Sequence, residues 1–159
     1  MKRATRKVLT LAATVAAAAL LSACGQNGPP DYMRIAGGGL TFNYRYSEAR
    51  AIIVGRQVTP LPEGSSVEAL FDIPGQTRRE KVSRPALAGK LVYKLESSPL
   101  TGIKKGVPLK VTLLVIDAGG KEIDREETQY VSDVDQDALP TKPLVDPSKP
   151  NYVPQLENL

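Results

Sequence analysis

The sequence contains no histidine, no tryptophan and only one cysteine among 159 residues. A single cysteine excludes an intrachain disulfide framework. The absence of histidine removes the commonest general base and the commonest transition-metal ligand. The absence of tryptophan removes the largest of the aromatic platforms on which sugars stack. Together these absences argue against an enzyme and weaken the case for a glycan-binding domain.

Long apolar runs are also missing. The longest, Val8 to Leu21, has 14 residues and includes Thr10 and Thr14, whereas a transmembrane helix needs about 20 apolar residues, or at least roughly 17. The run follows a basic N-terminus and leads into small residues, which is the order of a secretory signal peptide. We therefore predict a signal peptide over residues 1–23, with a short tilted membrane anchor as the alternative.

The predicted signal ends in Leu21-Ser22-Ala23-Cys24, which contains the only cysteine. This tetrapeptide resembles the lipobox of bacterial lipoproteins. The resemblance implies a diacylglyceryl group on the Cys24 sulfur, cleavage before Cys24 and acylation of the new amino group. Several acyl chains on one residue hold a protein firmly on a bilayer, whereas one chain binds reversibly. Cys24 is therefore the predicted lipidation site, and its modification leaves no thiol for catalysis or metal binding.

Residues 23–32 resemble the Cys-Gly-x-Lys-Gly-Pro-Leu attachment peptide of proteobacterial lipoproteins, although Asn27 replaces the lysine and Pro30 the leucine. The residue after the cysteine is Gly25 rather than aspartate, which in enteric bacteria is the usual signal for retention in the inner membrane. The resemblance therefore implies a lipid-anchored protein on the periplasmic face of the outer membrane. We do not carry over the translocon-assembly role of one group member, because its short relatives lack a β-domain.

The excess of basic over acidic residues lies entirely in the predicted signal peptide. The formal net charge is +4, from 21 basic and 17 acidic residues. Removing residues 1–23 removes four basic residues and no acid, because Lys2, Arg3, Arg6 and Lys7 lie there, and leaves 17 of each sign. The charge therefore gives no reason to expect nucleic acid as a partner.

Glycine and proline divide the rest of the chain into three segments. Gly25, Gly28, Pro29-Pro30 and Gly37–Gly39 interrupt any periodicity, which predicts a flexible tether over residues 24–39. Residues 40–135 have the length of a single domain. Residues 136–159 contain prolines at intervals of three or four residues and predict an extended tail.

The tail has three interpretations: it is disordered, it lies along the domain, or it is a docking arm for a partner. Because it has few apolar side chains, we expect deletion of residues 140–159 to cost the domain little stability.

Short runs with a period of two follow one another at intervals of roughly 10 residues. They are Leu40–Tyr46, Ala51–Val58, Val67–Ile73, a weak charged run Thr77–Val82, Leu91–Leu95, Val107–Ile116 and Ile123–Val131, with hairpin-turn residues at Asp117–Gly120. No segment sustains a helical period. The pattern predicts an all-β sandwich or small barrel of six to seven strands.

Residues 107–123 resemble the late strands of periplasmic immunoglobulin-like domains, although the tryptophan and cysteine pair of antibody domains are absent. We therefore expect an immunoglobulin-like β-sandwich of antiparallel strands. This resemblance implies a fold and no activity.

One acidic cluster, Asp133-Val-Asp-Gln-Asp137, resembles the start of a calcium loop. The sixth position is Ala138 where the loop needs glycine, the twelfth is Leu144 where it needs glutamate, and Pro140 lies between them. We expect a solvated acidic turn, and no metal or other cofactor.

Two other clusters invite comparison with binding sites. Arg78–Lys81, with Arg84, forms a basic stretch without interleaved aromatic residues, which favours a protective charged edge strand over a nucleotide or sugar site. Tyr44, Tyr46 and Tyr93 lie at strand spacing, which favours half-buried core residues over an exposed patch.

The sequence leaves two main classes of function. The first is a non-enzymatic assembly or scaffold module of the cell envelope, anchored to the lipid bilayer through Cys24 and bound to an envelope protein. The second is a domain that binds envelope glycan or a small solute. An enzyme with an unusual site, such as a Ser-Lys pair, is a third class to which no motif points.

Overall fold

The computed structural model describes residues 31–145 as seven strands and one short 3-10 helix. The elements are β1 (Met33–Asn43), β2 (Glu48–Gln57), β3 (Ser66–Asp72), β4 (Arg79–Pro85), β5 (Val92–Glu96), β6 (Pro108–Ile116), β7 (Glu122–Val131) and η1 (Gln136–Ala138). Within residues 31–145, no helix has the length and apolar character needed to cross a bilayer. The predicted lipidation site, Cys24, lies outside the described residues.

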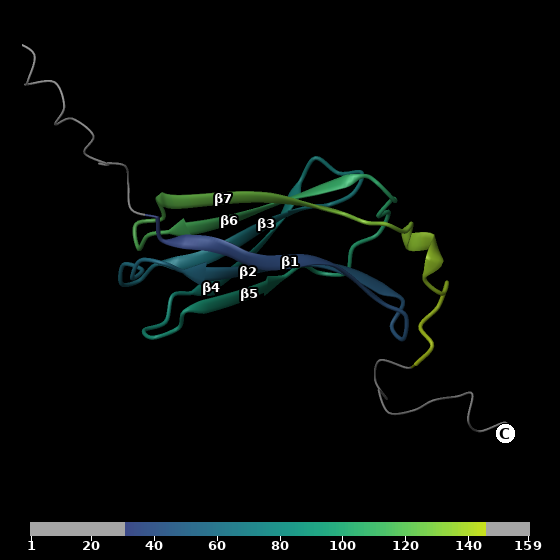
Figure 1. Ribbon diagram of the computed structural model, residues 1–159, viewed down its shortest axis with the longest axis horizontal. Coiled ribbons are helices and arrows are strands. Elements are labelled where there is room, and N and C mark those ends of the chain that lie inside the picture. The colour runs from purple at the N-terminus through teal and green to yellow at the C-terminus, as the bar shows by residue number, and fades with distance from the viewer. Residues whose placement is uncertain (1–30, 146–159) are drawn as a thin grey trace, which may run out of the picture.

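The strands form two antiparallel sheets that pack face to face (Figure 1). One sheet has the order β1-β2-β5 and the other the order β4-β3-β6-β7. This corresponds to strands A-B-E and C′-C-F-G of an immunoglobulin-like sandwich. The prediction of an all-β sandwich of six to seven antiparallel strands is confirmed, and the structure has seven.

Alternate side chains from both sheets form the core between the layers, as the period of two predicts. The buried apolar residues of the strands include Ala49, Ala51 and Ile53 of β2, Val67, Ala69 and Phe71 of β3, Tyr93 and Leu95 of β5, and Leu109, Val111, Leu113 and Val115 of β6. The Asp117–Gly120 turn is also as predicted, because the Asp117 carboxylate accepts hydrogen bonds from the backbone of Gly119 and Lys121.

The predicted tether is wrong for residues 33–39, which belong to β1. Gly37, Gly38 and Gly39 pair in register with residues of β2. A Cβ atom on Gly38 would lie 2.1 Å from the Tyr130 hydroxyl oxygen and 2.3 Å from the Ile52 carbonyl oxygen. Gly38 is therefore required by the close approach of β7 to β1, and a glycine triplet that predicts flexibility in the sequence has a packing role in the fold.

The first predicted strand ends earlier than expected, at Asn43. The Asn43 side-chain oxygen accepts hydrogen bonds from the backbone N–H groups of Arg45 (3.1 Å) and Tyr46 (3.3 Å), which turns the chain toward β2. Tyr44 is 51% exposed in this turn, whereas Tyr93 is fully buried in the core. The three tyrosines therefore form no common patch, and the expectation of half-buried core residues is wrong for Tyr44.

The predicted domain boundary at residue 135 is wrong, because residues 136–145 also pack on the sandwich, as one of the three interpretations of the tail expects. Leu139 and Val145 are buried. The backbone N–H groups of Leu144 and Val145 donate to the Arg45 carbonyl oxygen, at 2.8 and 3.2 Å. The Ser47 hydroxyl donates to the Pro140 carbonyl. The folded unit therefore extends to Val145.

Substitution of Val145 tests this packing. We expect Val145→Ala to lower the free energy of unfolding by about 2 kcal/mol, because a buried aliphatic side chain is lost from a closed site. Leu144→Ala is the matched control, since Leu144 is 41% exposed and Val145 only 4%. Chemical denaturation of the two variants measures the difference, and equal small effects would show that residues 140–145 are dispensable.

The register gives the sandwich two distinct ends (Figure 1). Met33 pairs with Gln57, and Arg56 pairs with Val92, so β1 and β5 begin where β2 finishes. We call this the proximal end, and it carries the loops 58–65, 86–91 and 117–121. The opposite, distal end carries the turns 44–47 and 73–78, the loop 97–107 and the segment 132–145.

Candidate functional site

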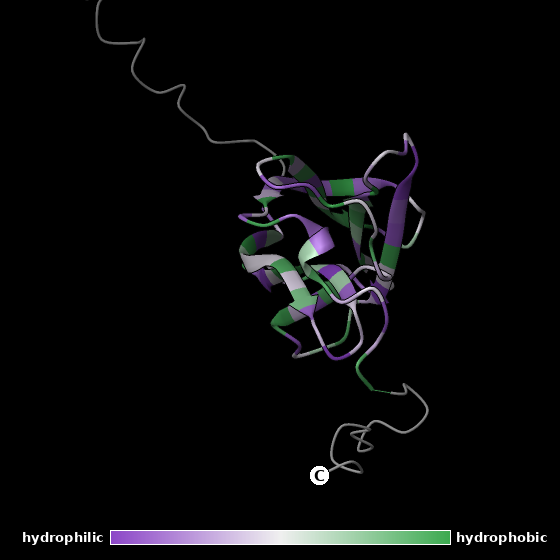
Figure 2. Ribbon diagram, turned by 90° about the vertical axis from the view of Figure 1, so that its right-hand side faces the viewer, coloured by the Kyte–Doolittle hydropathy of each residue, from purple (hydrophilic) through white to green (hydrophobic). Residues whose placement is uncertain are grey.

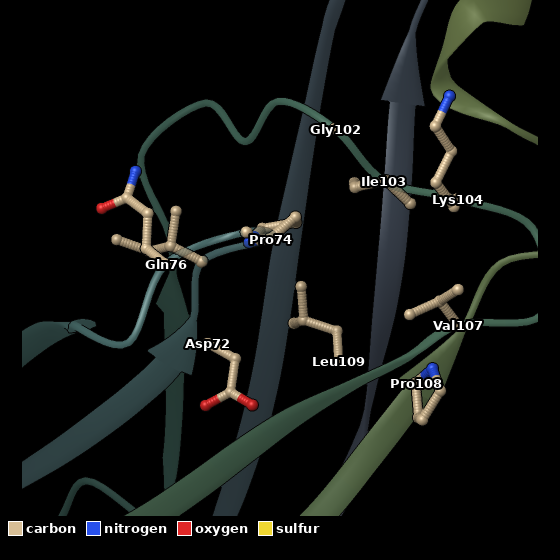
Figure 3. Close-up of a pocket in the computed structure, with 11 residues that line it drawn as sticks. Asp72, Pro74, Gln76, Gly102, Ile103, Lys104, Val107, Pro108 and Leu109 are labelled. Carbon is tan, nitrogen blue, oxygen red and sulfur yellow. The ribbon is translucent and has the colours of Figure 1, made fainter.

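A cavity of about 230 Å³ opens at the distal end, between the β3–β4 turn and the loop that joins β5 to β6 (Figure 3). Its lining residues are Asp72, Ile73, Pro74, Gly75, Gln76, Gly102, Ile103, Lys104, Val107, Pro108 and Leu109. The Pro74-Gly75 turn, with Gly75 at a φ of 74°, reverses the chain tightly and forms one wall.

The inner walls of the cavity are aliphatic. Ile103 and Leu109 are 3% and 5% exposed and belong to the core cluster. Pro74 faces them, while Asp72, Gln76 and Lys104 lie at the margin (Figure 3). The cavity therefore offers an apolar interior with a polar rim, the usual arrangement of a binding pocket.

The charges at the rim are already paired. The Asp72 carboxylate accepts hydrogen bonds from Arg79 Nε at 2.7 Å and from the Lys110 backbone N–H at 3.3 Å. Lys104 Nζ lies 2.9 Å from Asp137 Oδ2, and this hydrogen bond raises the pKa of Lys104. The arrangement favours an apolar group over an ion as the occupant of the cavity.

Exposed apolar side chains continue from the cavity across the distal end. Val107 and Val131 are 57% and 55% exposed, and Val134 is 42% exposed. Val131 pairs in register with Pro108, which lines the cavity together with Val107. We call Val107, Pro108, Val131 and Val134 the distal patch. Figure 2 views the molecule from this end, where green hydrophobic segments lie among purple hydrophilic ones.

The acidic cluster after β7 anchors the chain. Asp135 Oδ1 accepts a hydrogen bond from the Lys105 backbone N–H at 2.9 Å, and Asp137 pairs with Lys104. In the part of the chain that the structure describes, no group of three or more acidic residues is placed to hold a metal ion. Asp133, Asp135 and Asp137 are all exposed, as expected for a solvated acidic turn.

The basic stretch lies on β4, which is an edge strand as predicted, because it pairs only with β3. Arg79 is bound into the sheet rather than free for a ligand. Its guanidinium donates to the Thr112 hydroxyl at 3.0 Å and to the Leu70 carbonyl at 2.9 Å. These contacts satisfy the side chain of Thr112, which is fully buried on the outer face.

The same outer face continues as an ion-pair network over β6 and β7. Arg125 contacts Glu122 at 2.7 Å and Glu127 at 3.1 Å, and Lys110 contacts Glu127 at 2.8 Å. The hydrogen bond from Arg125 lowers the pKa of Glu122, and the one from Lys110 lowers the pKa of Glu127. With each charge paired on this face, the distal end is the better candidate for a binding surface.

The sequence did not reveal the cavity. The expected runs Val67–Ile73 and Val107–Ile116 match β3 and β6 to within one residue, and the turn Pro74-Gly75 follows β3. The cavity depends on how the loop 97–107 returns past that turn, which has no local sequence signal. The only feature near the cavity that stands out along the chain is that two apolar residues, Val107 and Pro108, come before the first buried residue of the strand, Leu109.

No family model and no curated protein sequence matches this chain. Among solved structures, the chain is similar to wild-type OgpA from Akkermansia muciniphila, at 17% identity over 68% of this chain and a TM-score of 0.41. A catalytically inactive OgpA in complex with an O-glycopeptide substrate gives 15% identity over 68% of this chain and a TM-score of 0.40. The chain spans only 29% and 30% of the length of these two structures.

Proposed function

We propose that this protein is a membrane-anchored periplasmic lipoprotein of the outer membrane that acts as a non-enzymatic scaffold and holds an envelope protein at its distal end. Cys24 carries the lipid, the sandwich is a rigid spacer, and the distal patch with its cavity is the docking surface.

The proposal rests on one observation: the start of the described chain and the distal patch lie at opposite ends of the sandwich. The described chain begins at Asp31 beside the proximal end, whereas the cavity and the distal patch lie at the other end of the sandwich (Figure 1). An anchor at Cys24, seven residues before Asp31, attaches the chain on the proximal side. The distal patch is then directed away from the bilayer, where a partner can reach it.

The size and lining of the cavity favour a protein over a small solute or a glycan. Pockets for small molecules usually have volumes of about 300–1,000 Å³. The cavity has about 230 Å³, while about 150 Å³ is enough for benzene. It therefore suits one apolar anchor side chain of a partner, the usual centre of a protein interface. Its lining residues include no aromatic side chain on which a sugar ring would stack.

Photo-crosslinking in intact cells tests the proposal. A photoreactive residue at Val131 should give crosslinks to one envelope protein, identified by mass spectrometry, whereas the same residue at Val58 of the proximal end should not. Adding Val107→Asp should reduce the crosslink yield from position 131 by a factor of about 30, because a charge at an apolar anchor site costs about 2 kcal/mol or more.

Val58→Asp is the matched control, since Val58 is 47% exposed and Val107 57% exposed, at opposite ends. Recovery of glycan alone from position 131 would contradict the scaffold proposal and favour the glycan-binding alternative. If the two aspartate substitutions reduced the crosslink yield equally, the distal patch would not be the docking surface.

A further inference from the structure

We propose that the proximal end docks on the lipid bilayer, with Leu87, Leu91 and Val92 as its membrane-contacting side chains. The inference rests on the proposed lipid anchor at Cys24 and adds a second contact with the same membrane. In this arrangement the loop 86–91 contacts the bilayer and thereby orients the whole sandwich on the membrane.

The first support is the exposure of aliphatic side chains at this end. Leu87, Leu91 and Val92 are 54%, 59% and 51% exposed, and Val58 beside them is 47% exposed. The alternating pattern predicts Leu91 on the core face with Tyr93, which is wrong, because Leu91 lies one residue before the start of β5 and is exposed. Single exposed aliphatic residues are common, but a group of them at one end indicates an interaction surface.

The second support is the position of the chain start. The Val58 N–H donates to the Tyr32 carbonyl at 2.9 Å, and the Gln57 N–H donates to the Leu91 carbonyl at 2.8 Å. Tyr32 and Leu91 therefore flank the same end of β2. Asp31 follows Cys24 by seven positions, and even a fully extended chain of that length spans at most about 25 Å. An acylated Cys24 keeps this end of the sandwich within that distance of the bilayer.

The third support is that hydrogen bonds hold the loop 86–91 in a fixed conformation. The Lys90 N–H donates to the Leu87 carbonyl at 3.1 Å and closes a turn, with Gly89 at a φ of 75°. The Leu87 N–H donates to the Tyr93 hydroxyl at 3.1 Å, and Lys90 Nζ lies 5.0 Å from the centre of the Tyr93 ring. Since Tyr93 is buried in the core, it fixes the loop with its leucines in solvent. Contact with a membrane then requires little further ordering.

The charges at this end indicate that apolar contact, rather than headgroup charge, determines docking. The charged residues of the proximal loops, of the chain start and of the adjoining strand ends are of both signs: Asp31, Glu63, Asp117 and Glu122 against Arg56, Arg84, Lys90 and Lys121. Two leucines and a valine are too few to bind a free protein to lipid. Tethering raises their effective concentration at the bilayer to roughly the millimolar range, where weak contacts persist.

The absence of tryptophan from the chain allows a clean test, because Leu91→Trp introduces a single indole. Val107→Trp is the matched control at the distal end, since Leu91 and Val107 are 59% and 57% exposed. The full-length lipidated variants are reconstituted in vesicles of phosphatidylethanolamine and phosphatidylglycerol with brominated acyl chains. We expect about twofold quenching and a blue-shifted emission at position 91, since interfacial side chains reach the acyl boundary, and neither effect at position 107.

A second variant and a flotation assay separate the possible failures. Leu87→Asp combined with Leu91→Trp should abolish the quenching while the protein still floats with the vesicles. Flotation without quenching at position 91 would overturn the docking and leave the lipid anchor intact. Quenching at both positions would refute the orientation, and a protein that does not float would refute the anchor and the docking together.

Discussion

Replacing Gly38 with alanine should lower the free energy of unfolding by about 2 kcal/mol or more, and the melting temperature by about 10 °C. Gly38 has a φ of 142°. The new Cβ would lie 2.1 Å from the Tyr130 hydroxyl oxygen and 2.3 Å from the Ile52 carbonyl oxygen. The carbonyl belongs to the sheet backbone and cannot move away without disturbing the pairing of β1 with β2.

Gly37→Ala is the matched control, because a Cβ on Gly37 meets nothing within 4 Å. We expect this variant to melt close to the wild-type temperature. Adding Tyr130→Phe to Gly38→Ala should restore only part of the lost stability, since the contact with Ile52 remains. Tyr130→Phe alone should cost little, because the buried Tyr130 hydroxyl has no hydrogen-bond partner among the described residues. Equal, small effects at Gly37 and Gly38 would instead support a flexible glycine tether.

Replacing Cys24 with serine should release most of the protein from the membrane fraction, an effect of about tenfold or more, because the acyl chains are lost with the sulfur. The expected products are an unprocessed precursor or a soluble periplasmic form, detected by fractionation and immunoblotting. Gly25→Asp is the control variant, which keeps the cysteine. In an enteric host it should move the protein to the inner-membrane fraction of a sucrose gradient without detaching it.

A Cys24→Ser protein that is still processed before residue 24 and still sediments with membranes would contradict the lipoprotein assignment. Co-migration of the wild-type protein with inner-membrane markers would contradict only its outer-membrane location.

The strands were predictable because each is a short run whose side chains alternate between core and solvent. Val107–Ile116 is the clearest example, since Leu109, Val111, Leu113 and Val115 are all buried in β6. The weak run Thr77–Val82 overlaps β4, which begins two residues later and ends at Pro85, and its charges conceal the alternation. A charged edge strand needs only one partner, and β3 supplies it to β4.

The boundaries were less predictable where long-range contacts override local composition. Gly38 looks flexible in sequence, but Tyr130, 92 positions later, lies directly against it. Val145 stands in a proline-rich segment, but a backbone hydrogen bond to Arg45 places it in a buried site. Leu91 fits the alternation of β5, but the strand begins one residue later and leaves it exposed.

The candidate binding surfaces could not be predicted for the same reason. The cavity joins the turn at Pro74 to the loop at Ile103, and the distal patch joins Val107 to Val131. Pro74 and Ile103 come together only when the loop after β5 returns past the β3–β4 turn, and Val107 reaches Val131 only when β6 pairs with β7. Cys24 differs because a lipidation motif is read from a short local sequence, and it is therefore the one site that the sequence alone predicts.

Mass spectrometry of the mature N-terminus tests the central claim most directly. The protein is extracted from membranes with detergent and digested, and its N-terminal peptide is fragmented. We predict a peptide that begins at Cys24 and carries a diacylglyceryl group on the sulfur and an acyl chain on the amino group. A peptide that retains Ala23 before Cys24, or a Cys24 with a free thiol in the membrane-bound protein, would contradict the account.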